Sequence, residues 1–444
     1  MSNFIANWWR SQQLKSALSR GDTRRAVQLL QDIQKSGANF SWLEKLFRDK
    51  LQLERSFQEY KREKANLTKQ ITDASQKVDE LNLQLTFDYS AEIAFKPNEV
   101  FISKTLKDFE LFNKDKTKIQ CTGIDRNTFD ELEKYLIEYL EDELKQKSSK
   151  KGFLEDLRIA SEDIISLKKG KDPDYQYAIT PHVYFMRYFL EGVYSAYIAW
   201  FLVYKAGLLK PKINLLDIGA GSGSIFYGLF ALLKNVCFDE KSTQIHVSYC
   251  SFEKQKYLQY YGLQFWRKYE KYHNTPAVNA YLRFYTSDIF QYATNASDLE
   301  QLPNNFYDFI SISHCIFAEK QERIASHQKY KYIFQKALKN DGYILVVVQG
   351  RRLCQAYERQ MTEDESQEKN LIEMFVEELG LKLVWYKYIT STGKRKPMIS
   401  SEFARFAREN LPIQKYMTEL AKKYQVVNHD LNYVLDDYVI LARK

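Results

Sequence analysis

Short apolar segments alternate with longer amphipathic segments along the C-terminal half of this 444-residue chain. The short segments are typical of buried strands, and intervening segments such as residues 254–272 have the spacing of helices. This alternation predicts a mostly parallel sheet with helices on both faces, which is an α/β fold. The last two of the expected strands follow one another along the chain, and we expect them to pair with each other as an antiparallel pair that ends the sheet. The seven expected strands are residues 213–217, 245–252, 281–287, 307–313, 343–349, 381–388 and 434–442.

The N-terminal residues have a helical pattern instead. No proline precedes Pro97, and Gly21 and Gly37 are the only glycines among the first 85 residues, which favours helix. Residues 1–40 are predicted to form a helical hairpin that turns at Gly21. Residues 41–86 are predicted to form a long coiled-coil helix, because side chains from Leu53 to Leu85, all apolar except Lys64, recur at alternating spacings of four and three. A single amphipathic helix that packs on its own domain is the alternative.

Residues 87–175 are predicted to form a mixed helical and irregular connector. The α/β region follows at residues 176–444, and it opens with an aromatic helix pair at about 180–208. A long insertion at about 390–432 separates its last two strands. The elements expected in the connector are strands at 100–103 and 118–122, a helix that begins at Asn127 or Thr128, and basic loops at 145–152 and 168–174.

Composition and charge narrow the class of protein. Hydrophobic residues make up 45% of the chain and aromatic residues 15%, as expected of a folded protein. The formal net charge of +8 is compatible with RNA or an acidic partner. The five cysteines are scattered, so neither a disulfide framework nor a metal site is expected. The first residues lack the pattern of a signal peptide and no segment is typical of a membrane span, so we expect a cytoplasmic protein.

The stretch LLDIGAGSGS, residues 215–224, places three glycines behind an apolar strand and ahead of a helix-like run. Glycine at such a turn lets the backbone approach a ligand closely. The spacing of Asp217, Gly219, Gly221 and Gly223 resembles motif I of the class I S-adenosylmethionine-dependent methyltransferases. The resemblance implies a seven-stranded Rossmann-like sheet and S-adenosylmethionine as the cofactor. The glycine backbone would then lie against the cofactor, and Asp217 would help to hold its amino group, partly through water.

Two further acidic residues follow strands at matching positions. The resemblance, which covers about residues 176–444, implies that Glu253 holds the ribose hydroxyls and that Asp288 lies near the adenine amino group. A carboxylate can accept two hydrogen bonds from a diol. Each acid on its own is also compatible with an ordinary cap at the end of a strand.

The acceptor is expected over the end of the fourth strand, around His314 and Cys315. His314 is a candidate general base because its unperturbed pKa lies near neutrality, although it could instead only hydrogen-bond the substrate or the backbone. Cys315 is expected to pack, and Glu319 is an alternative carboxylate. No metal ligands are expected.

Two segments are candidates for defining the acceptor. The aromatic stretch before motif I contains Tyr184, Arg187, Tyr188 and Glu191 at helical spacing, which is compatible with a pocket or with core packing. The insertion at about 390–432 contains the basic sequence GKRKP and two arginines further on, which would suit a phosphate-bearing or acidic acceptor or would simply be solvated.

These observations predict a methyltransferase that acts on a macromolecule, RNA or protein. The helical arm would recruit a protein partner or mediate self-association. The alternatives are a catalytically inactive scaffold that keeps the cofactor pocket, and a methyltransferase that acts on a small molecule.

Overall fold

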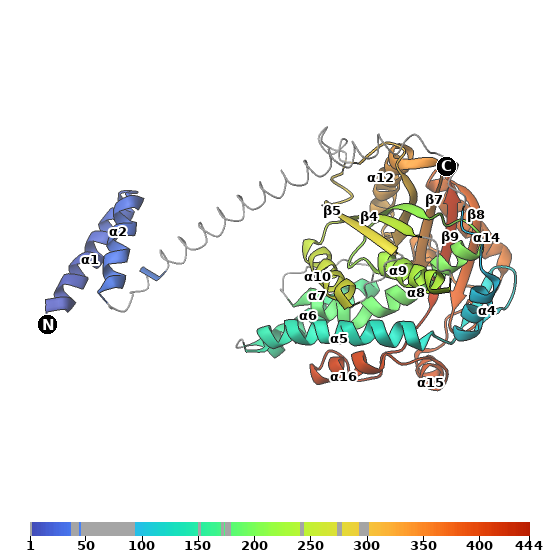
Figure 1. The fold of residues 1–444 in the computed structure, drawn as a ribbon, viewed down its shortest axis with the longest axis horizontal. Coiled ribbons are helices and arrows are strands. Elements are labelled where there is room, and N and C mark those ends of the chain that lie inside the picture. Colours follow the sequence, from blue (N-terminus) through green and yellow to red (C-terminus); the bar gives the residue numbers. More distant parts are fainter. Residues whose placement is uncertain are drawn as a thin grey trace. The chain divides into compact units, whose positions relative to one another are not determined.

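The computed structural model describes residues 2–36, 44–45, 94–149, 152–169, 173, 179–239, 244–272, 278–292 and 302–444. The chain forms two compact units, Met1–Ala91 and Glu92–Lys444 (Figure 1). Nearly all of the predicted coiled coil at residues 41–86 lies outside the described residues, and it stays a prediction. No described helix is long and apolar enough to cross a membrane.

The first unit contains two helices around a tight turn, α1 (Ser2–Ser19) and α2 (Thr23–Lys35). Gly21 adopts a φ of +73°, and the Asp22 side chain accepts a hydrogen bond from the Arg25 amide at 3.0 Å, which caps α2. The core of this unit consists of small and aliphatic side chains: Leu14, Ala17, Ala26, Leu29, Leu30 and Ile33.

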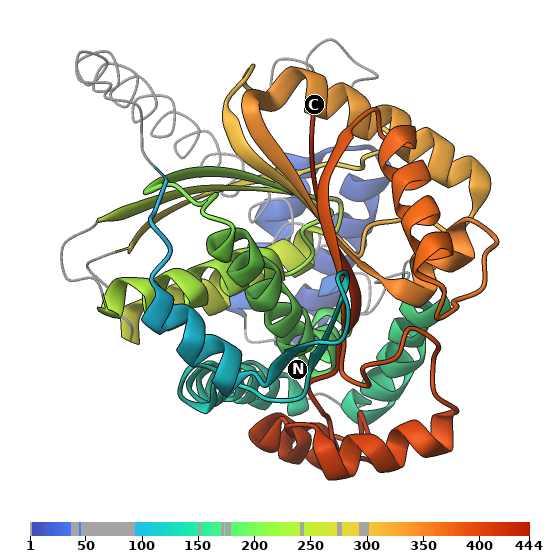
Figure 2. The ribbon, with the colours of Figure 1, turned by 90° about the vertical axis from the view of Figure 1, so that its right-hand side faces the viewer.

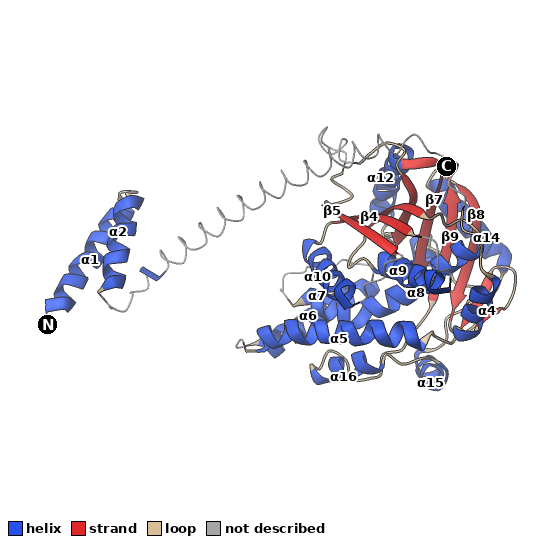
Figure 3. Cartoon of the chain, viewed as in Figure 1, coloured by secondary structure: helices blue, strands red, loops and turns tan. Residues whose placement is uncertain are grey.

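The second unit is built around a mixed sheet of nine strands in the order β1-β2-β8-β9-β7-β6-β3-β4-β5 (Figure 3). The expected number of seven was therefore wrong, because a hairpin from the predicted connector adds two strands beyond β8. The strands are β1 (Leu111–Asn113), β2 (Lys118–Cys121), β3 (Lys212–Ile218), β4 (Ile245–Glu253), β5 (Val278–Thr286), β6 (Tyr307–Ser313), β7 (Leu338–Gln349), β8 (Lys382–Thr390) and β9 (Asp436–Arg443).

The strand order creates a reversal in the middle of the sheet. From β3 the chain first proceeds outward through β4 and β5, and it then returns to the other side of β3 through β6 and β7. All these neighbours are parallel. β9 lies antiparallel between β7 and β8, so the antiparallel strands pair as predicted but do not end the sheet. Ligands of such folds bind at the carboxyl ends of the strands where the order reverses, here between β3 and β6.

The prediction of a strand at residues 100–103 is wrong. These residues belong to α4 (Glu99–Asp108), since the Asn98 side chain accepts hydrogen bonds from the Val100 and Phe101 amides and caps a helix. Similarly, the loop expected at 145–152 is helical as far as Ser148. The prediction at 118–122 is confirmed by β2, which pairs in parallel with β8.

The helices cover both faces of the sheet (Figure 2). Their bounds are α5 (Arg126–Ser148), α6 (Phe153–Ile164), the 3₁₀ helix η1 (Ile165–Lys169), α7 (Thr180–Tyr184), the π-helix η2 (Phe185–Phe189), α8 (Leu190–Lys205), α9 (Ser224–Asp239), α10 (Lys256–Tyr272), α12 (Lys320–Ala337), α13 (Gly350–Ala356), α14 (Glu365–Glu378), α15 (Ser400–Asn410) and α16 (Lys415–Lys423).

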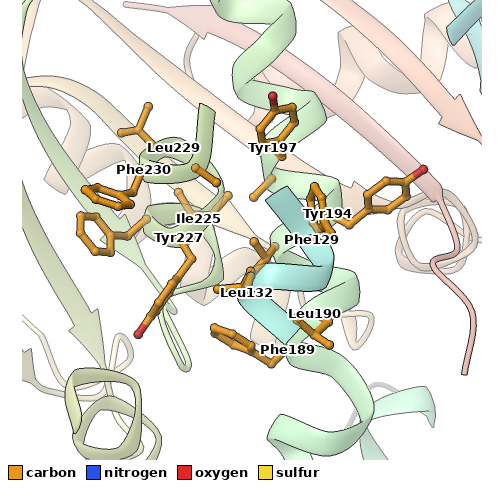
Figure 4. Packing of buried hydrophobic residues seen from close by; sticks show 14 of the residues in the cluster. Phe129, Leu132, Phe189, Leu190, Tyr194, Tyr197, Ile225, Tyr227, Leu229 and Phe230 are labelled. Carbon is orange, nitrogen blue, oxygen red and sulfur yellow. The ribbon is translucent and has the colours of Figure 1, made fainter. Parts of the chain in front are cut away.

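Alternate side chains of the strands enter two cores. Leu215 of β3 and Phe309 of β6 belong to the larger core with α5, α8 and α9, whereas Leu216 and Ile310 belong to the core with α12 and α14. Many side chains of the larger core are aromatic, and Figure 4 shows side chains from α5, α8 and α9 packed together. Most of the aromatic stretch before motif I is therefore core.

Candidate functional site

The three glycines of motif I form the turn that follows β3. Gly219, Gly221 and Gly223 have φ values of +66°, +55° and +86°, a region that other residues rarely adopt. The Gly219 amide donates to the Phe252 carbonyl of β4 at 2.8 Å. A Cβ atom on Gly219 would lie only 2.5 Å from Cys315 Sγ, which follows β6. The loop therefore lies directly at the reversal in strand order, with residues after β6 against it.

Asp217 lies behind this loop with its side chain completely buried. Tyr249 donates a hydrogen bond to Asp217 Oδ2 at 3.0 Å, and Ser311 donates to Oδ1 at 2.8 Å. Burial is the main cause that raises the pKa of Asp217 from 3.8 to about 7, and the two hydroxyl donors oppose it. Asp217 thus links β3 to both of its neighbouring strands, β4 and β6, next to the glycine loop. This structural role is additional to the cofactor contact predicted from the sequence.

The raised pKa predicts a pH dependence of stability that Asp217→Asn removes. Between about pH 4 and 7 the folded chain keeps a proton on Asp217 that the unfolded chain has lost, so its contribution to stability falls as the pH rises through this window. The free energy of unfolding of Asp217→Asn relative to wild type should therefore increase from pH 4 to 7 in chemical denaturation. A difference that stays constant over this range would contradict the prediction.

Glu253 ends β4 and lies against the glycine loop. Its Oε2 atom accepts a hydrogen bond from the Gly221 amide at 2.8 Å, and its Oε1 atom accepts one from the Gln255 amide at 2.7 Å. The structure therefore brings Glu253 and Gly221 together although they are far apart in sequence.

Asp288 follows the end of β5, one strand further out. Its carboxylate accepts a hydrogen bond from the Phe290 amide at 2.9 Å, so it caps the turn that it begins. The preceding Ser287 amide donates to the Glu253 carbonyl at 3.0 Å, which fixes this turn to the end of β4. Asp288 is thus a cap at a strand end, and it also neighbours the glycine loop through Glu253.

His314 follows β6 on the other side of the reversal. It has a φ of +54°, which is costly for a residue with a Cβ and is held by the hydrogen bond from its amide to the Val347 carbonyl at 2.8 Å. Its Nδ1 atom lies 3.9 Å from Oδ1 of Asp437, a buried residue of β9. Ser195 of α8 donates to Asp437 Oδ2 at 2.6 Å. His314 therefore faces a buried, oriented carboxylate.

Sequence reasoning missed Asp437, which is distant from His314 along the chain. The available signal was two consecutive acids, Asp436 and Asp437, directly before the apolar run of the last strand. Burial raises the pKa of Asp436 to about 7, and Tyr388 donates a hydrogen bond to it. The alternative carboxylate, Glu319, is exposed and accepts a hydrogen bond from the Glu322 amide at 2.9 Å as the cap of α12.

The basic sequence GKRKP contains a buried ion cluster. Arg395 is only 2% exposed and donates to Glu368 at 2.6 Å and to Asp115 at 2.7 Å. Its guanidinium is therefore neither solvated nor available to an acceptor. The arginines further on in the insertion, Arg405 and Arg408, are exposed on α15.

The residues of the loop fit a nucleoside cofactor. A Cβ on Gly221 or Gly223 would meet no atom closer than 3.4 Å, so a ligand can approach the backbone there, and the Glu253 carboxylate lies against the Gly221 amide. Among the described residues, no group of three or more His, Cys, Asp or Glu side chains could hold a metal ion.

The comparison with solved structures returns methyltransferases at low identity and low TM-score. No protein-family model matches the sequence, and no curated protein matches it. The solved structure of loganic acid methyltransferase with SAH is 10% identical, with 59% of this chain and 96% of that chain covered and a TM-score of 0.31. The plantazolicin methyltransferase BpumL is 14% identical, with coverages of 72% and 98% and a TM-score of 0.27.

A third similar structure is the 16S rRNA (adenine(1408)-N(1))-methyltransferase from Catenulisporales acidiphilia, which is 7% identical. The match covers 52% of this chain and 85% of that chain, with a TM-score of 0.27. The named acceptors of these three proteins differ in kind. At such identities and TM-scores these matches carry no argument about function, and the chemistry of this chain has to be argued from its own residues.

Proposed function

We propose that this protein is an S-adenosylmethionine-dependent methyltransferase. The observation that carries the proposal is the glycine loop at the reversal in strand order, where Glu253 accepts a hydrogen bond from the Gly221 amide at 2.8 Å. In a doubly wound sheet this is the position where nucleotide-like ligands bind. The loop would hold the methionine part of the cofactor, Glu253 the ribose hydroxyls, and Asp288 would lie near the adenine.

The protein's own contribution to the reaction is positioning and proton transfer. The bound cofactor supplies a methyl group on a positively charged sulfur, which an acceptor lone pair can attack in line. A nitrogen or oxygen acceptor loses a proton as its new bond to carbon forms. His314 is the base that we assign to this proton, because it follows β6 beside the glycine loop. Asp437 would stabilise the imidazolium and orient its ring, as acids do in other acid–histidine pairs.

Substitutions of His314 and Asp437 test this assignment. His314→Gln should lower kcat by about 100-fold or more, the usual contribution of a general base. Asp437→Asn should lower kcat less than His314→Gln does, because the imidazole stays in place but loses the carboxylate that orients it. His246→Gln is the matched control, since His246 is the second residue of β4, at the other end of this strand from Glu253. A kcat that Asp437→Asn leaves unchanged would contradict the positioning role.

The acceptor that we favour is a macromolecule, RNA or protein. The proposal is supported by the N-terminal unit, where Trp8 and Trp9 of α1 are 55% and 58% exposed. Exposed tryptophans are typical of surfaces that bind a partner. This unit would recruit a partner protein or a second copy of the chain.

Fractionated cell extract distinguishes the possible acceptors. Incubation with labelled S-adenosylmethionine should transfer label to an extract and release S-adenosylhomocysteine. Loss of transfer after RNase treatment would identify RNA as the acceptor, and loss after protease treatment would identify protein. Transfer that survives both would indicate a small molecule. Tight cofactor binding without transfer to any fraction would indicate an inactive scaffold and refute the enzymatic proposal.

A further inference from the structure

A cavity of about 550 Å³ opens beside the helix that precedes motif I. Arg187 of η2 is one lining residue, and the others come from the end of α16 and the segment after it, among them Lys422, Val426, Val427 and His429. None of the lining residues is among the cofactor-binding or catalytic residues predicted from the sequence. The sequence did indicate Arg187 and the insertion at about 390–432, each separately, as segments that could define the acceptor.

The cationic side chains of the cavity are not equally available. Arg187 is half-buried and makes no hydrogen bond or ion pair with any described residue. Lys422, in contrast, forms an ion pair with Asp430 at 2.6 Å. The planar guanidinium of an arginine presents paired N–H donors that match a carboxylate or a phosphate. Arg187 is therefore the group in the cavity that can receive an oxyanion without losing an existing partner.

The helix that carries Arg187 relates the cavity to the candidate site. α7, η2 and α8 are consecutive along the chain. Three residues before Arg187, the Tyr184 hydroxyl lies 3.4 Å from the position that a Cβ on Gly221 would take. Eight residues after it, Ser195 donates to Asp437. At 1.5 Å per residue these positions are about 5 and 12 Å from Arg187 along the helix axis.

Residues 185–189 form a single π-helical turn within this helix. Such turns occur often at functional sites, where they change the direction of side chains. The turn contains Arg187 and lies between the residues that reach the glycine loop and the residue that reaches Asp437.

We propose that this cavity binds a carboxylate or phosphate group of the methyl acceptor, with Arg187 as its main ligand. The inference depends on the proposed function only in assigning the anion to the acceptor. Val426 and Val427 are buried beside the cavity and would contact the carbon part of the same molecule. The methylated atom then lies roughly one to two helical turns from the anionic group, near His314.

Calorimetric titration of the full chain with inorganic phosphate and, separately, with succinate tests the site at constant ionic strength. The wild-type protein should bind at least one of the two anions, and the stronger one identifies phosphate or carboxylate as the preferred group. Arg187→Gln should weaken this binding at least tenfold. Arg405→Gln is the matched control, because Arg405 is exposed on α15 and outside the cavity, and it should bind like the wild type.

A second variant covers the case that Arg187→Gln does not fold. Gln425 is exposed and lines the cavity, so Gln425→Glu adds a negative charge with little change of shape and should also weaken anion binding. Absence of binding to both anions, or equal affinities of wild type and these variants, would overturn the inference.

Titration of the wild-type protein with S-adenosylmethionine, carried out in parallel, separates this inference from the proposed function. If the wild type binds an anion but not S-adenosylmethionine, the proposed function alone is refuted. If it binds S-adenosylmethionine but neither anion, only this site is refuted.

Discussion

Gly221→Arg should abolish binding of S-adenosylmethionine, with an affinity at least 100-fold below that of the wild type, or about 2.7 kcal/mol. The Gly221 backbone has a φ of +55°, and its amide donates to Glu253. A Cβ there would lie 3.4 Å from the Tyr184 hydroxyl. The longer arginine side chain would therefore enter the space in front of the loop, and its charge would pair with the carboxylate that is expected to hold the ribose.

Gly152→Arg provides the matched control for this experiment. Gly152 has a φ of +89°, so the same substitution introduces similar backbone strain, but a Cβ there would meet nothing within 4 Å. Its heat of binding should equal that of the wild type. If the wild type gives no heat, or if Gly221→Arg binds as tightly as the wild type, the assignment of the cofactor site is wrong.

Arg395→Met should lower the free energy of unfolding of the second unit by about 3–5 kcal/mol, because it leaves the buried Glu368 carboxylate without its counter-charge. Arg395 Nε donates to Glu368 at 2.6 Å, and its terminal nitrogens donate to Asp115 and Thr117, both at 2.7 Å. These contacts join the β1–β2 hairpin and α14 to the beginning of the insertion. The side chain of Glu368 is only 3% exposed. The loss is measured as a shift of the denaturant midpoint.

Arg158→Met is the corresponding surface control. Arg158 on α6 pairs with Glu155 and Glu162 on the same helix, and all three side chains are more than half exposed. Exposed pairs of this kind contribute little to stability, so the midpoint should hardly move. Equal shifts in the two variants would show that the buried cluster around Arg395 has no special importance.

The positions of the strands in the second half were predictable to within a few residues. Strands that are buried on both faces have continuous apolar runs, and β6 was predicted with its observed bounds. The fold class followed from the alternation of these runs with helices. Pairing within the sheet did not follow, because hydrogen bonds between strands leave no local signal. The insertion of β9 between β7 and β8 and the two added strands were therefore missed.

In the candidate site, too, local features were predictable from the sequence and contacts between distant residues were not. Motif I and the acid that follows β4 were recognisable because a tight turn and a strand end impose local residue types, as at Gly221 and Glu253. The pairing of His314 with Asp437 required the antiparallel return of the last strand. Arg395 gives the converse case: its basic neighbours suggested an exposed loop, whereas its acidic partners come from distant elements.

The sequence by itself determined the α/β class, the glycine turn and the residue types at the strand ends, since periodic burial and backbone geometry constrain neighbouring residues directly. Only the tertiary structure decided which of the charged residues are buried with partners and which remain open to a ligand. That distinction separates Arg395 from Arg187, because the cost of burying a charge depends on groups that the fold brings from elsewhere in the chain.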